Sequence, residues 1–381
     1  MNSPKLYEVA LTLIPKIGSI LGRQLIQAFG SAEKVFSTPP GKLRSVPGIG
    51  KRISDELHHK EQWLRKAHNI IEQCRKLGIQ ITTITSSDYP YRLKEIPDAP
   101  LVLYYTGNLE ILNRPAVAIV GTRKPSGYGY YFLDSFFNDL KQYSLITLSG
   151  LAYGIDVYAH QKSIDSGIPT AAVLAGGLNQ IYPPDHIKIA KIILKNSGLL
   201  LTESPPYTQT HPALFPARNR IIAGLSDVVV VVEARKKGGA LITARLANDY
   251  NREVMAVPGS VFHDTSEGCH LLIKTQQAHL LEQAEDLVRL MGWDLSPASH
   301  EEKKLPALSP TERQIIKLLL KAPDYRMSTE ALSLHSEQLF PELYASLLQL
   351  EVKGVLQAQA GNSYQIIPQW LPILKRHFTD S

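Results

Sequence analysis

The chain has 381 residues, more than a single domain usually contains, and its 44% hydrophobic and 20% charged residues are typical of globular protein. No apolar run approaches the roughly 20 residues that a transmembrane helix needs. The first residues also lack the apolar core and cleavage site of a secretory signal, so we expect a cytoplasmic protein without a membrane partner. Two cysteines exclude a disulfide framework. A net charge of +6 permits an anionic partner such as nucleic acid without requiring one.

Residues 1–80 predict a domain of short helices that contains two similar hairpins. These are "IPKIGSILGRQLIQAF" from Ile14 and "VPGIGKRISDEL" from Val46, which have the pattern of a helix-hairpin-helix or SAM-like module. In such a hairpin the glycines permit a tight turn whose N–H groups can meet a phosphate, and Lys51 and Arg52 follow the second turn. The same hairpins also occur as packing modules that never touch DNA, so both interpretations stay open.

Residues 81–295 change to alternating strands and helices, the order of a βαβ series. Continuous β-branched runs such as 228–232 belong to strands that are covered on both faces. We therefore predict a doubly wound α/β domain with a mainly parallel sheet. The expected strands are 116–121, 145–150, 170–176, 199–204, 227–234 and 253–259.

Residues 296–308 are rich in Pro and charge and predict a linker, and a third domain follows over 309–381. Ser309, with Glu312 three residues later, predicts a capping box at the start of a helix. The later segments have the helix, helix and β-ribbon order of a winged helix. Its last helix, within 337–352, has no Lys or Arg but has Glu337, Glu342 and Glu351, which would repel phosphates. We interpret this domain as a protein-contact or packing module.

Ligands of open α/β sheets bind beyond the carboxyl ends of the strands, and here those positions carry glycines and basic residues. Ser149 and Gly150 end one strand just before a helix, where N–H groups can meet an anion. Gly238 and Gly239 flank another helix start, with Thr243 one turn later. Several such loops suit a chain of phosphates better than one mononucleotide. The basic residues of these loops are Arg123, Lys124, Arg218, Arg220, Arg235, Lys236 and Lys237.

Individual residues of this edge have competing interpretations. Phe215 can stack on a base, as aromatic residues of single-strand binders do, or lie in the core. Asn219 either faces the ligand or caps a helix. Asp156 and His160 share a helix face at a metal-ligand spacing, but no further His or Cys accompanies them, which favours buried hydrogen bonding. We expect no metal site, no cofactor and no catalytic residue, because no nucleophile has a matched base.

The motifs together resemble the DNA-processing protein A family, also called Smf, which acts in natural transformation. The resemblance covers nearly the whole chain, in the family's order. It rests on "YPYRLKEIPDAPLVLYYTGN" (89–108), "VGTRKPS", "SGLAYGIDVYAH" (149–160), "GGLNQIYPPDH", "TESPP", "FPARNRIIAGLS", "GGALITARLA" and "VPGS". It implies an extended Rossmann-like domain between a helical amino-terminal domain and a carboxyl-terminal winged helix.

This resemblance further implies a protein without enzymatic activity that binds single-stranded DNA, protects incoming strands and loads the RecA recombinase. It also implies a homodimer formed through the Rossmann-like domain. Arg123 and Arg218 are the expected phosphate contacts, and the "SGLAYGID" turn is expected to hold a phosphate. Carried over by motif, the expected DNA-binding residues are Gly121, Thr122, Arg123, Ser149, Gly150, Phe215, Arg218, Asn219, Arg220, Lys237, Gly238, Gly239 and Thr243.

One departure and two alternatives accompany the resemblance. The last glycine turn reads "KKGGALITA", whereas the family often has Ser before a single Gly. Related Rossmann-like folds include hydrolases of nucleoside monophosphates, which need a carboxylate soon after the glycine turn; here Ala244, Arg245 and Leu246 follow Thr243, which disfavours that enzyme. A pure protein-interaction scaffold would show no DNA affinity, and the repeated basic residues argue against it.

Overall fold

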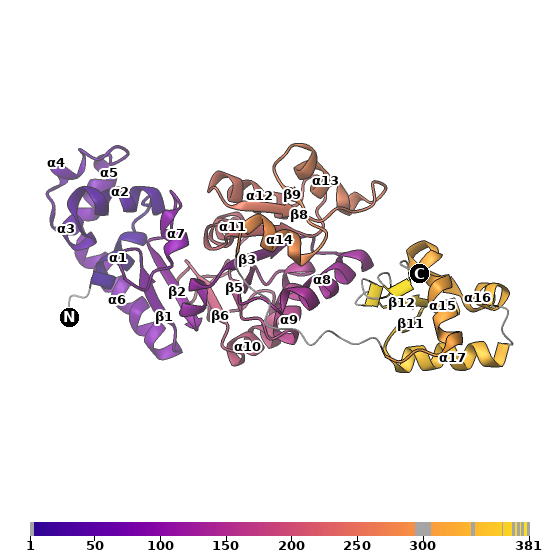
Figure 1. Ribbon diagram of the computed structural model, residues 1–381. Helices are drawn as coiled ribbons and strands as arrows, with labels where there is room; N and C mark the ends of the chain where they lie inside the picture. Colours follow the sequence, from indigo (N-terminus) through magenta and orange to yellow (C-terminus); the bar gives the residue numbers. More distant parts are fainter. Residues whose placement is uncertain are drawn as a thin grey trace. The chain divides into compact units, whose positions relative to one another are not determined.

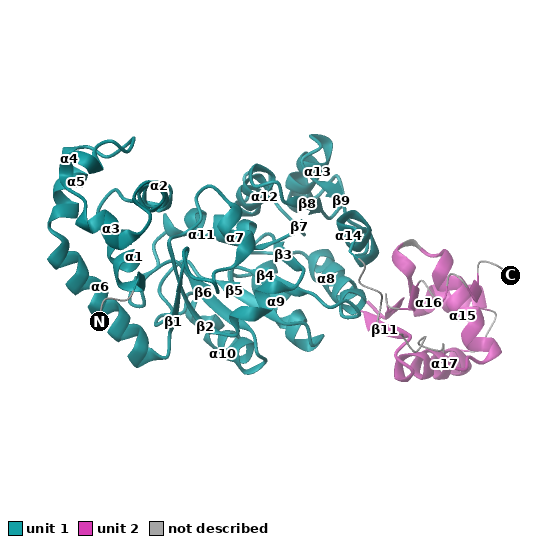
Figure 2. Ribbon diagram, turned by 60° about the vertical axis from the view of Figure 1, so that its left-hand side comes forward, with its two compact units in different colours: residues 1–296 teal, residues 297–381 magenta. Residues whose placement is uncertain are grey.

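The computed structural model describes residues 4–293, 306–336, 340–359, 361–367, 370–371, 374 and 377–378. The chain divides into two compact units, residues 1–296 and 297–381, which Figure 2 colours separately. Most of the predicted linker, residues 296–305, lies outside the described residues. Within the described ranges, no helix is both long enough and apolar enough to cross a membrane.

The first unit is built on a sheet of nine described strands in the order β1-β2-β6-β5-β4-β3-β7-β8-β9. The seven strands from β6 to β9 pair in parallel, whereas β1 and β2 are antiparallel at one edge. The predicted mixed α/β class with a mainly parallel sheet is confirmed. The strands are β1 (Gln80–Thr83), β2 (Val102–Gly107), β3 (Ala116–Val120), β4 (Ile146–Ser149), β5 (Thr170–Val173), β6 (Leu199–Thr202), β7 (Val228–Val231), β8 (Glu253–Ala256) and β9 (His279–Leu280).

The central strand β3 marks the point where the winding of the sheet reverses. From β3 the chain moves through β4, β5 and β6 on one side, then crosses to β7, β8 and β9 on the other. The loops after β3 and β7, which are neighbouring strands, therefore lead in opposite directions and leave a crevice between them. This topology places the candidate site at the carboxyl ends of β3 and β7.

Helices cover both faces of this sheet (Figure 1). Side chains of β3 alternate between two cores: Ala116 and Ala118 belong to one, and Val117 and Ile119 to the other. This alternation follows from the two-residue period of a strand and explains the continuous apolar runs in the sequence. The helices of this region are α7 (Tyr91–Glu95), α8 (Gly127–Leu140), α9 (Ile155–Asp165), α10 (Ile187–Lys195), α11 (Leu214–Leu225), α12 (Gly239–Asp249), α13 (Glu267–Lys274) and α14 (Ala284–Met291), with 3-10 turns at Leu109–Asn113, Pro184–His186 and Asp264–Ser266.

The amino-terminal helices belong to the same compact unit as the sheet and share its larger core. The first predicted hairpin packs closely: Arg23 donates to the Ile96 carbonyl at 2.8 Å, and a Cβ on Gly22 would lie 2.3 Å from Leu101. The second hairpin, between α4 and α5, exposes Lys51 and Arg52. These helices are α1 (Pro4–Thr12), α2 (Ser19–Phe29), α3 (Ala32–Ser37), α4 (Pro40–Leu43), α5 (Lys51–His58) and α6 (Lys60–Leu77).

In its described residues, the second unit contains three α-helices and a small antiparallel sheet in the order β10-β12-β11. The predicted capping box is confirmed, because Ser309 Oγ accepts from the Glu312 N–H at 3.2 Å and Glu312 Oε2 accepts from the Ser309 N–H at 2.6 Å. The elements are α15 (Pro310–Lys321), a 3-10 turn (Pro323–Tyr325), β10 (Arg326–Ser328), α16 (Thr329–Ser336), α17 (Phe340–Val352), β11 (Leu356–Gln359) and β12 (Ser363–Ile366).

Candidate nucleic-acid interface

A cleft of about 680 Å³ lies at the carboxyl edge of the sheet, between the loops after β3 and β7 and beneath the first turns of α11 and α12. This is the crevice that the reversal of winding at β3 predicts. Among the predicted DNA-binding residues, those that line the cleft are Gly121, Thr122, Arg123, Phe215, Arg218, Asn219, Lys237, Gly238, Gly239 and Thr243. Ser149, Gly150 and Arg220 are not part of this lining, although Gly150 lines a smaller pocket beside it.

Arg123 and Phe215 form the central pair of the cleft. The guanidinium of Arg123 lies 5.5 Å from the centroid of the Phe215 ring, and Arg123 is exposed while Phe215 is half-buried. Phe215 is therefore not a core aromatic. The exposed Tyr182 ring lies 6.0 Å from Phe215. Sequence reasoning missed Tyr182, although the quoted "IYPPDH" motif contains it.

Arg218, an expected phosphate contact, is instead a buried structural cation. Only 5% of the residue is exposed, and its Nη1 donates to the carbonyls of Gly150 at 2.5 Å and Val173 at 2.6 Å. Its Nε donates to Asn219 Oδ1 at 3.2 Å. Burial lowers the pKa of the Arg218 guanidinium, and the charge of Asp156 opposes that shift. The guanidinium thus joins α11 to the ends of β4 and β5 and contributes only a small surface to the cleft.

The "SGLAYGID" turn also differs from its expected role of holding a phosphate. The Gly150 N–H donates to Asp156 Oδ2 at 3.2 Å, so the turn is closed by its own carboxylate. A Cβ on Gly150 would lie 2.0 Å from Arg218 Nη1, and one on Gly154, whose φ is +77°, would lie 2.4 Å from the Thr122 carbonyl oxygen. Both glycines are required by close protein neighbours.

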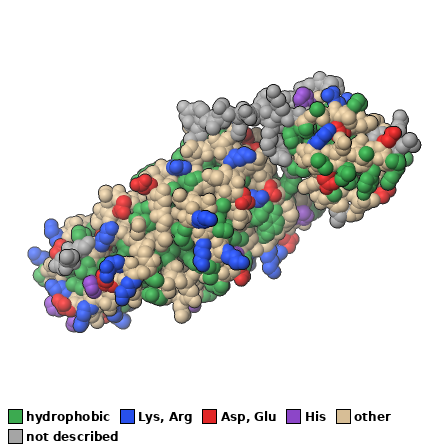
Figure 3. Space-filling view, turned by 90° about the horizontal axis from the view of Figure 1, so that it is seen from below, with side chains coloured by type: hydrophobic (Ala, Val, Ile, Leu, Met, Phe, Trp, Pro, Cys, Tyr) green, Lys and Arg blue, Asp and Glu red, His purple; other side chains and the backbone are tan. Residues whose placement is uncertain are grey.

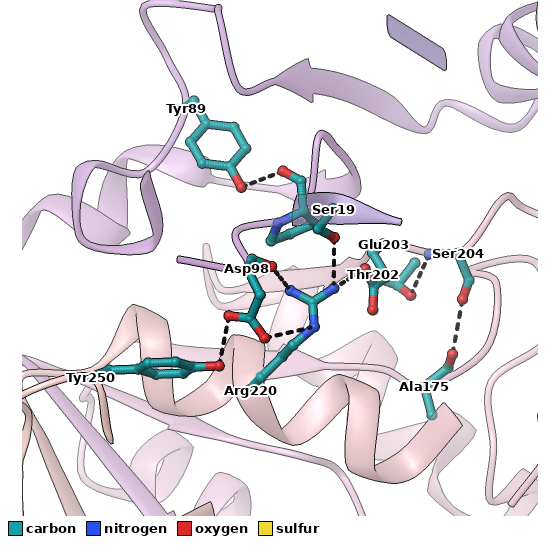
Figure 4. Close-up of polar contacts among 10 residues, drawn as sticks. Ser19, Tyr89, Asp98, Ala175, Thr202, Glu203, Ser204, Arg220 and Tyr250 are labelled. Carbon is teal, nitrogen blue, oxygen red and sulfur yellow. Dashed lines mark hydrogen bonds and ion pairs between the residues drawn. The ribbon is translucent and has the colours of Figure 1, made fainter. Parts of the chain in front are cut away.

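Arg220 does not line the cleft and instead belongs to a polar network that reaches Ser19 at the start of α2 (Figure 4). Its guanidinium pairs with Glu203 and donates to the Asp98 carbonyl at 2.5 Å and to Ser19 Oγ at 3.3 Å. Tyr250 donates to Asp98 Oδ1 at 2.7 Å. Burial raises the pKa of Glu203, and the Arg220 charge opposes that shift. Arg218 and Arg220, two positions apart on α11, therefore stabilise different parts of the fold. Arg218 binds the ends of β4 and β5, and Arg220 binds Glu203 and the start of α2.

The exposed charges that face the cleft are positive. Arg123, Arg235 and Lys237 are exposed, whereas the one acidic residue of the lining, Asp156, is only 6% exposed. The α12 helix begins at Gly239 without a side-chain cap, and nothing lies within 4 Å of the Cβ position of Gly239. Thr243, one turn later, is 2% exposed. Figure 3 shows Lys and Arg side chains distributed over one face of the first unit, among mostly uncharged atoms.

Asp156 and His160, the pair at a metal-ligand spacing, take part in buried hydrogen bonds, as the sequence favoured. His160 is fully buried, and its Nδ1 lies 2.7 Å from Thr170 Oγ1. His186 Nδ1 lies 2.7 Å from the Leu151 carbonyl oxygen. Glu203 pairs with Arg220. No cluster of three or more His, Cys, Asp or Glu suited to a metal occurs among the described residues.

Buried His160 predicts an acid-sensitive fold. Burial, with smaller contributions from Arg218 and His186, lowers the pKa of His160 from 6.5 to about 3. Between these values the unfolded chain binds a proton that the folded chain does not, so the free energy of unfolding falls as pH falls below 6.5. We expect His160 to account for about 2 kcal/mol of this loss between pH 7 and pH 5.

The test is urea denaturation of wild type and His160→Asn at both pH values, with His68→Asn as the matched control at an exposed histidine. The difference in the free energy of unfolding between pH 7 and pH 5 should be smaller in His160→Asn than in wild type, and it should be unchanged in His68→Asn. An undiminished pH difference in His160→Asn would show that His160 titrates normally.

Comparison with known proteins identifies the family of this chain. Residues 80–292, which include the whole cleft, match the family described as DNA recombination-mediator protein A. The chain belongs to this family. Protein Smf of Synechocystis sp. is 32% identical over 96% of this chain and 99% of its own length. DNA processing protein DprA of Bacillus subtilis is 36% identical over 73% of this chain and 93% of its own length.

Two solved structures of this family resemble the chain. The crystal structure of DNA processing protein A from Streptococcus pneumoniae superposes with a TM-score of 0.65 and 30% identity, covering 79% of this chain and 99% of that one. A structure of the Helicobacter pylori protein, described as giving insight into its single-stranded DNA binding mode, matches with a TM-score of 0.50 and 28% identity over 56% of this chain and 95% of its own. The predicted family resemblance is confirmed.

Proposed function

We propose that this member of the DNA recombination-mediator protein A family binds single-stranded DNA in the cleft between the β3 and β7 loops. The observation that carries the proposal is the Arg123 guanidinium 5.5 Å from the Phe215 ring, in a cleft whose exposed charges are positive. A cation beside a half-buried aromatic ring at a cleft suits a ligand with alternating phosphates and unpaired bases. The single-stranded DNA binding described for the H. pylori relative supports the same ligand.

The exposed residues of the cleft have two proposed roles, neutralising phosphates and stacking on bases. Arg123 and Lys237 neutralise phosphates, and the uncapped start of α12 at Gly239 offers backbone donors and partial positive charge. Phe215 and Tyr182 supply ring faces for bases. Since these groups read no base edges, we expect weak sequence preference.

The proposed role is binding without catalysis, with hydrolysis of nucleoside monophosphates as the alternative. Asp156, the carboxylate in the cleft lining, is buried, accepts from the Gly150 N–H and lies in the field of Arg218. Ala244 and Arg245 occupy the positions after Thr243 where the hydrolase reading requires an acid. The carboxylate is therefore used in the fold and is unsuited to a general base at a substrate.

Membership of the family also supports two protein partners. We infer that the chain acts in natural transformation, protects incoming single strands, passes them to the RecA recombinase and pairs with a second copy through its sheet domain. We further infer that residues 309–381 are a winged helix that contacts protein. Its α17 helix has no Lys or Arg and exposes Phe340, Tyr344, Leu348 and Val352 along one face, which favours a protein over a phosphate backbone.

The experiment that tests the proposal is a fluorescence-anisotropy titration of labelled oligothymidine, with duplex of equal length in parallel, over a series of salt concentrations. We expect tighter binding of the single strand, with log affinity falling linearly against log salt at about 0.7 per phosphate neutralised. The same preparation is assayed for release of base from nucleoside monophosphates. Salt-independent affinity, or base release without strand binding, would overturn the proposal.

A further inference from the structure

The loop after β8 carries an exposed aromatic residue outside the proposed cleft. At its tip, Val261 is 74% exposed and Phe262 is 89% exposed, and Phe262 is the most exposed large apolar side chain among the described residues. Neither residue lines the cleft. Val261 and Phe262 together place apolar surface in water at one loop tip.

Hydrogen bonds on both sides hold this tip in place. Tyr128 on α8 donates to the Pro258 carbonyl at 2.6 Å. Within the turn, the His263 N–H donates to the Ser260 carbonyl at 3.2 Å, and the Ser266 N–H donates to the His263 carbonyl at 2.9 Å. The ring is thus presented by an ordered turn, which lowers the entropic cost of binding a ligand there.

Buried Glu233 joins this loop to the loops that form the cleft. Its carboxylate, in a residue 3% exposed, accepts from the Ser126 N–H at 2.9 Å, from Ser126 Oγ at 2.7 Å and from Thr265 Oγ1 at 2.9 Å. The backbone continues the same connection, because Thr122 N–H donates to the Glu233 carbonyl and Ala234 N–H to the Thr265 carbonyl, each at 2.7 Å. Residues 121–126, 233–239 and 257–266 are therefore joined by hydrogen bonds, and this set of adjoining loops is here called the ledge.

The ledge carries exposed positive charge, which is what a surface needs in order to bind the phosphates of a DNA strand that extends out of the cleft. Arg235, Lys236 and Lys237 are exposed on its middle segment, and Arg235 and Lys237 also line the cleft. The acidic residues of the β8 loop, Asp264 and Glu267, follow the tip, so the basic segment is the favourable path for phosphates. An exposed ring on the same hydrogen-bonded set of loops as these cations suits the face of one unpaired base, whereas duplex bases are already stacked on each other.

We propose that Phe262 is a second stacking platform, which binds an unpaired base of a DNA strand that extends from the cleft along the ledge. This inference rests on the proposed function and extends it, because it makes the binding surface longer than the cleft. Phe215 then serves the part of the strand inside the cleft, and Phe262 the part that has passed the basic segment.

Oligothymidines of two lengths test the proposal, one of about six nucleotides that fills the cleft and one of about twenty that extends beyond it. Phe262→Ala should lower the affinity for the long oligonucleotide by about fivefold to a hundredfold and leave the affinity for the short one unchanged. Phe262→Trp should retain the long-strand affinity, and its added indole fluorescence should be quenched by the long strand alone. The matched control is Phe340→Ala, the same change at an exposed ring of the second unit.

Each outcome separates this proposal from the function on which it rests. Failure of the short strand to bind wild type counts against the cleft itself. Equal affinities of Phe262→Ala and wild type for the long strand would overturn the platform while leaving the cleft intact. Light scattering of the same variants completes the test: a loss of self-association in Phe262→Ala, with unchanged DNA affinity, would assign the ring to a contact between copies of the chain.

Discussion

Replacing Arg218 with Ala is expected to lower the free energy of unfolding by about 3–5 kcal/mol. The guanidinium is 5% exposed and donates to the carbonyls of Gly150 and Val173, so its removal leaves both acceptors unsatisfied inside the fold. Asp156 would also lose the positive charge that opposes the effect of its burial. The sequence alone suggested a phosphate contact at Arg218, whereas its buried position favours a role in stability.

Urea denaturation measures the free energy of unfolding of Arg218→Ala. Two further variants serve as controls, one that we expect to destabilise the fold and one that we expect to leave it unchanged. Gly150→Ala keeps Arg218 but places a Cβ 2.0 Å from its Nη1, so it should destabilise by displacing the guanidinium. Arg245→Ala removes an exposed arginine of α12 and should change stability by less than about 0.5 kcal/mol. Wild-type stability in Arg218→Ala, together with lost DNA affinity, would return Arg218 to the role of a phosphate contact.

The double variant Arg123→Ala/Lys237→Ala is expected to lose roughly a hundredfold in affinity for single-stranded DNA at low salt. Both side chains are exposed at the cleft, and a hydrogen bond to a charged phosphate contributes about 1.5 kcal/mol, or roughly tenfold, for each. The slope of log affinity against log salt should become shallower by about 1.4, because two phosphates are no longer neutralised. The free energy of unfolding should not change.

Anisotropy titrations over a salt series measure both quantities. Lys191→Ala is the matched control, since Lys191 is an exposed lysine of α10 that lies neither in the cleft lining nor on the ledge. It should retain the wild-type slope. A double variant with the wild-type slope would mean that phosphates bind elsewhere on the chain, and an equal loss in Lys191→Ala would reduce the effect to general surface charge.

The sequence by itself determined the class of fold and the edge of the sheet where the candidate site lies. The β-branched runs could only be strands covered on both faces, so they specified a mainly parallel sheet, and such sheets bind ligands at their carboxyl edge. Residues such as Arg123, Phe215 and Gly239 could be assigned to that edge because each directly follows a strand or begins a helix. Periodicity and order along the chain are local properties, so the sequence expresses them directly.

Only the tertiary structure decided which of the basic residues face the cleft. Arg218 and Arg220 stand two positions apart on α11, yet one is buried against β4 and β5 carbonyls and the other pairs with Glu203. Because Gly150 has no side chain, it leaves room for the guanidinium of Arg218, which is 68 residues away along the chain. These contacts join distant segments, and a charged residue pays for its burial only where such partners meet it, which the local sequence does not reveal.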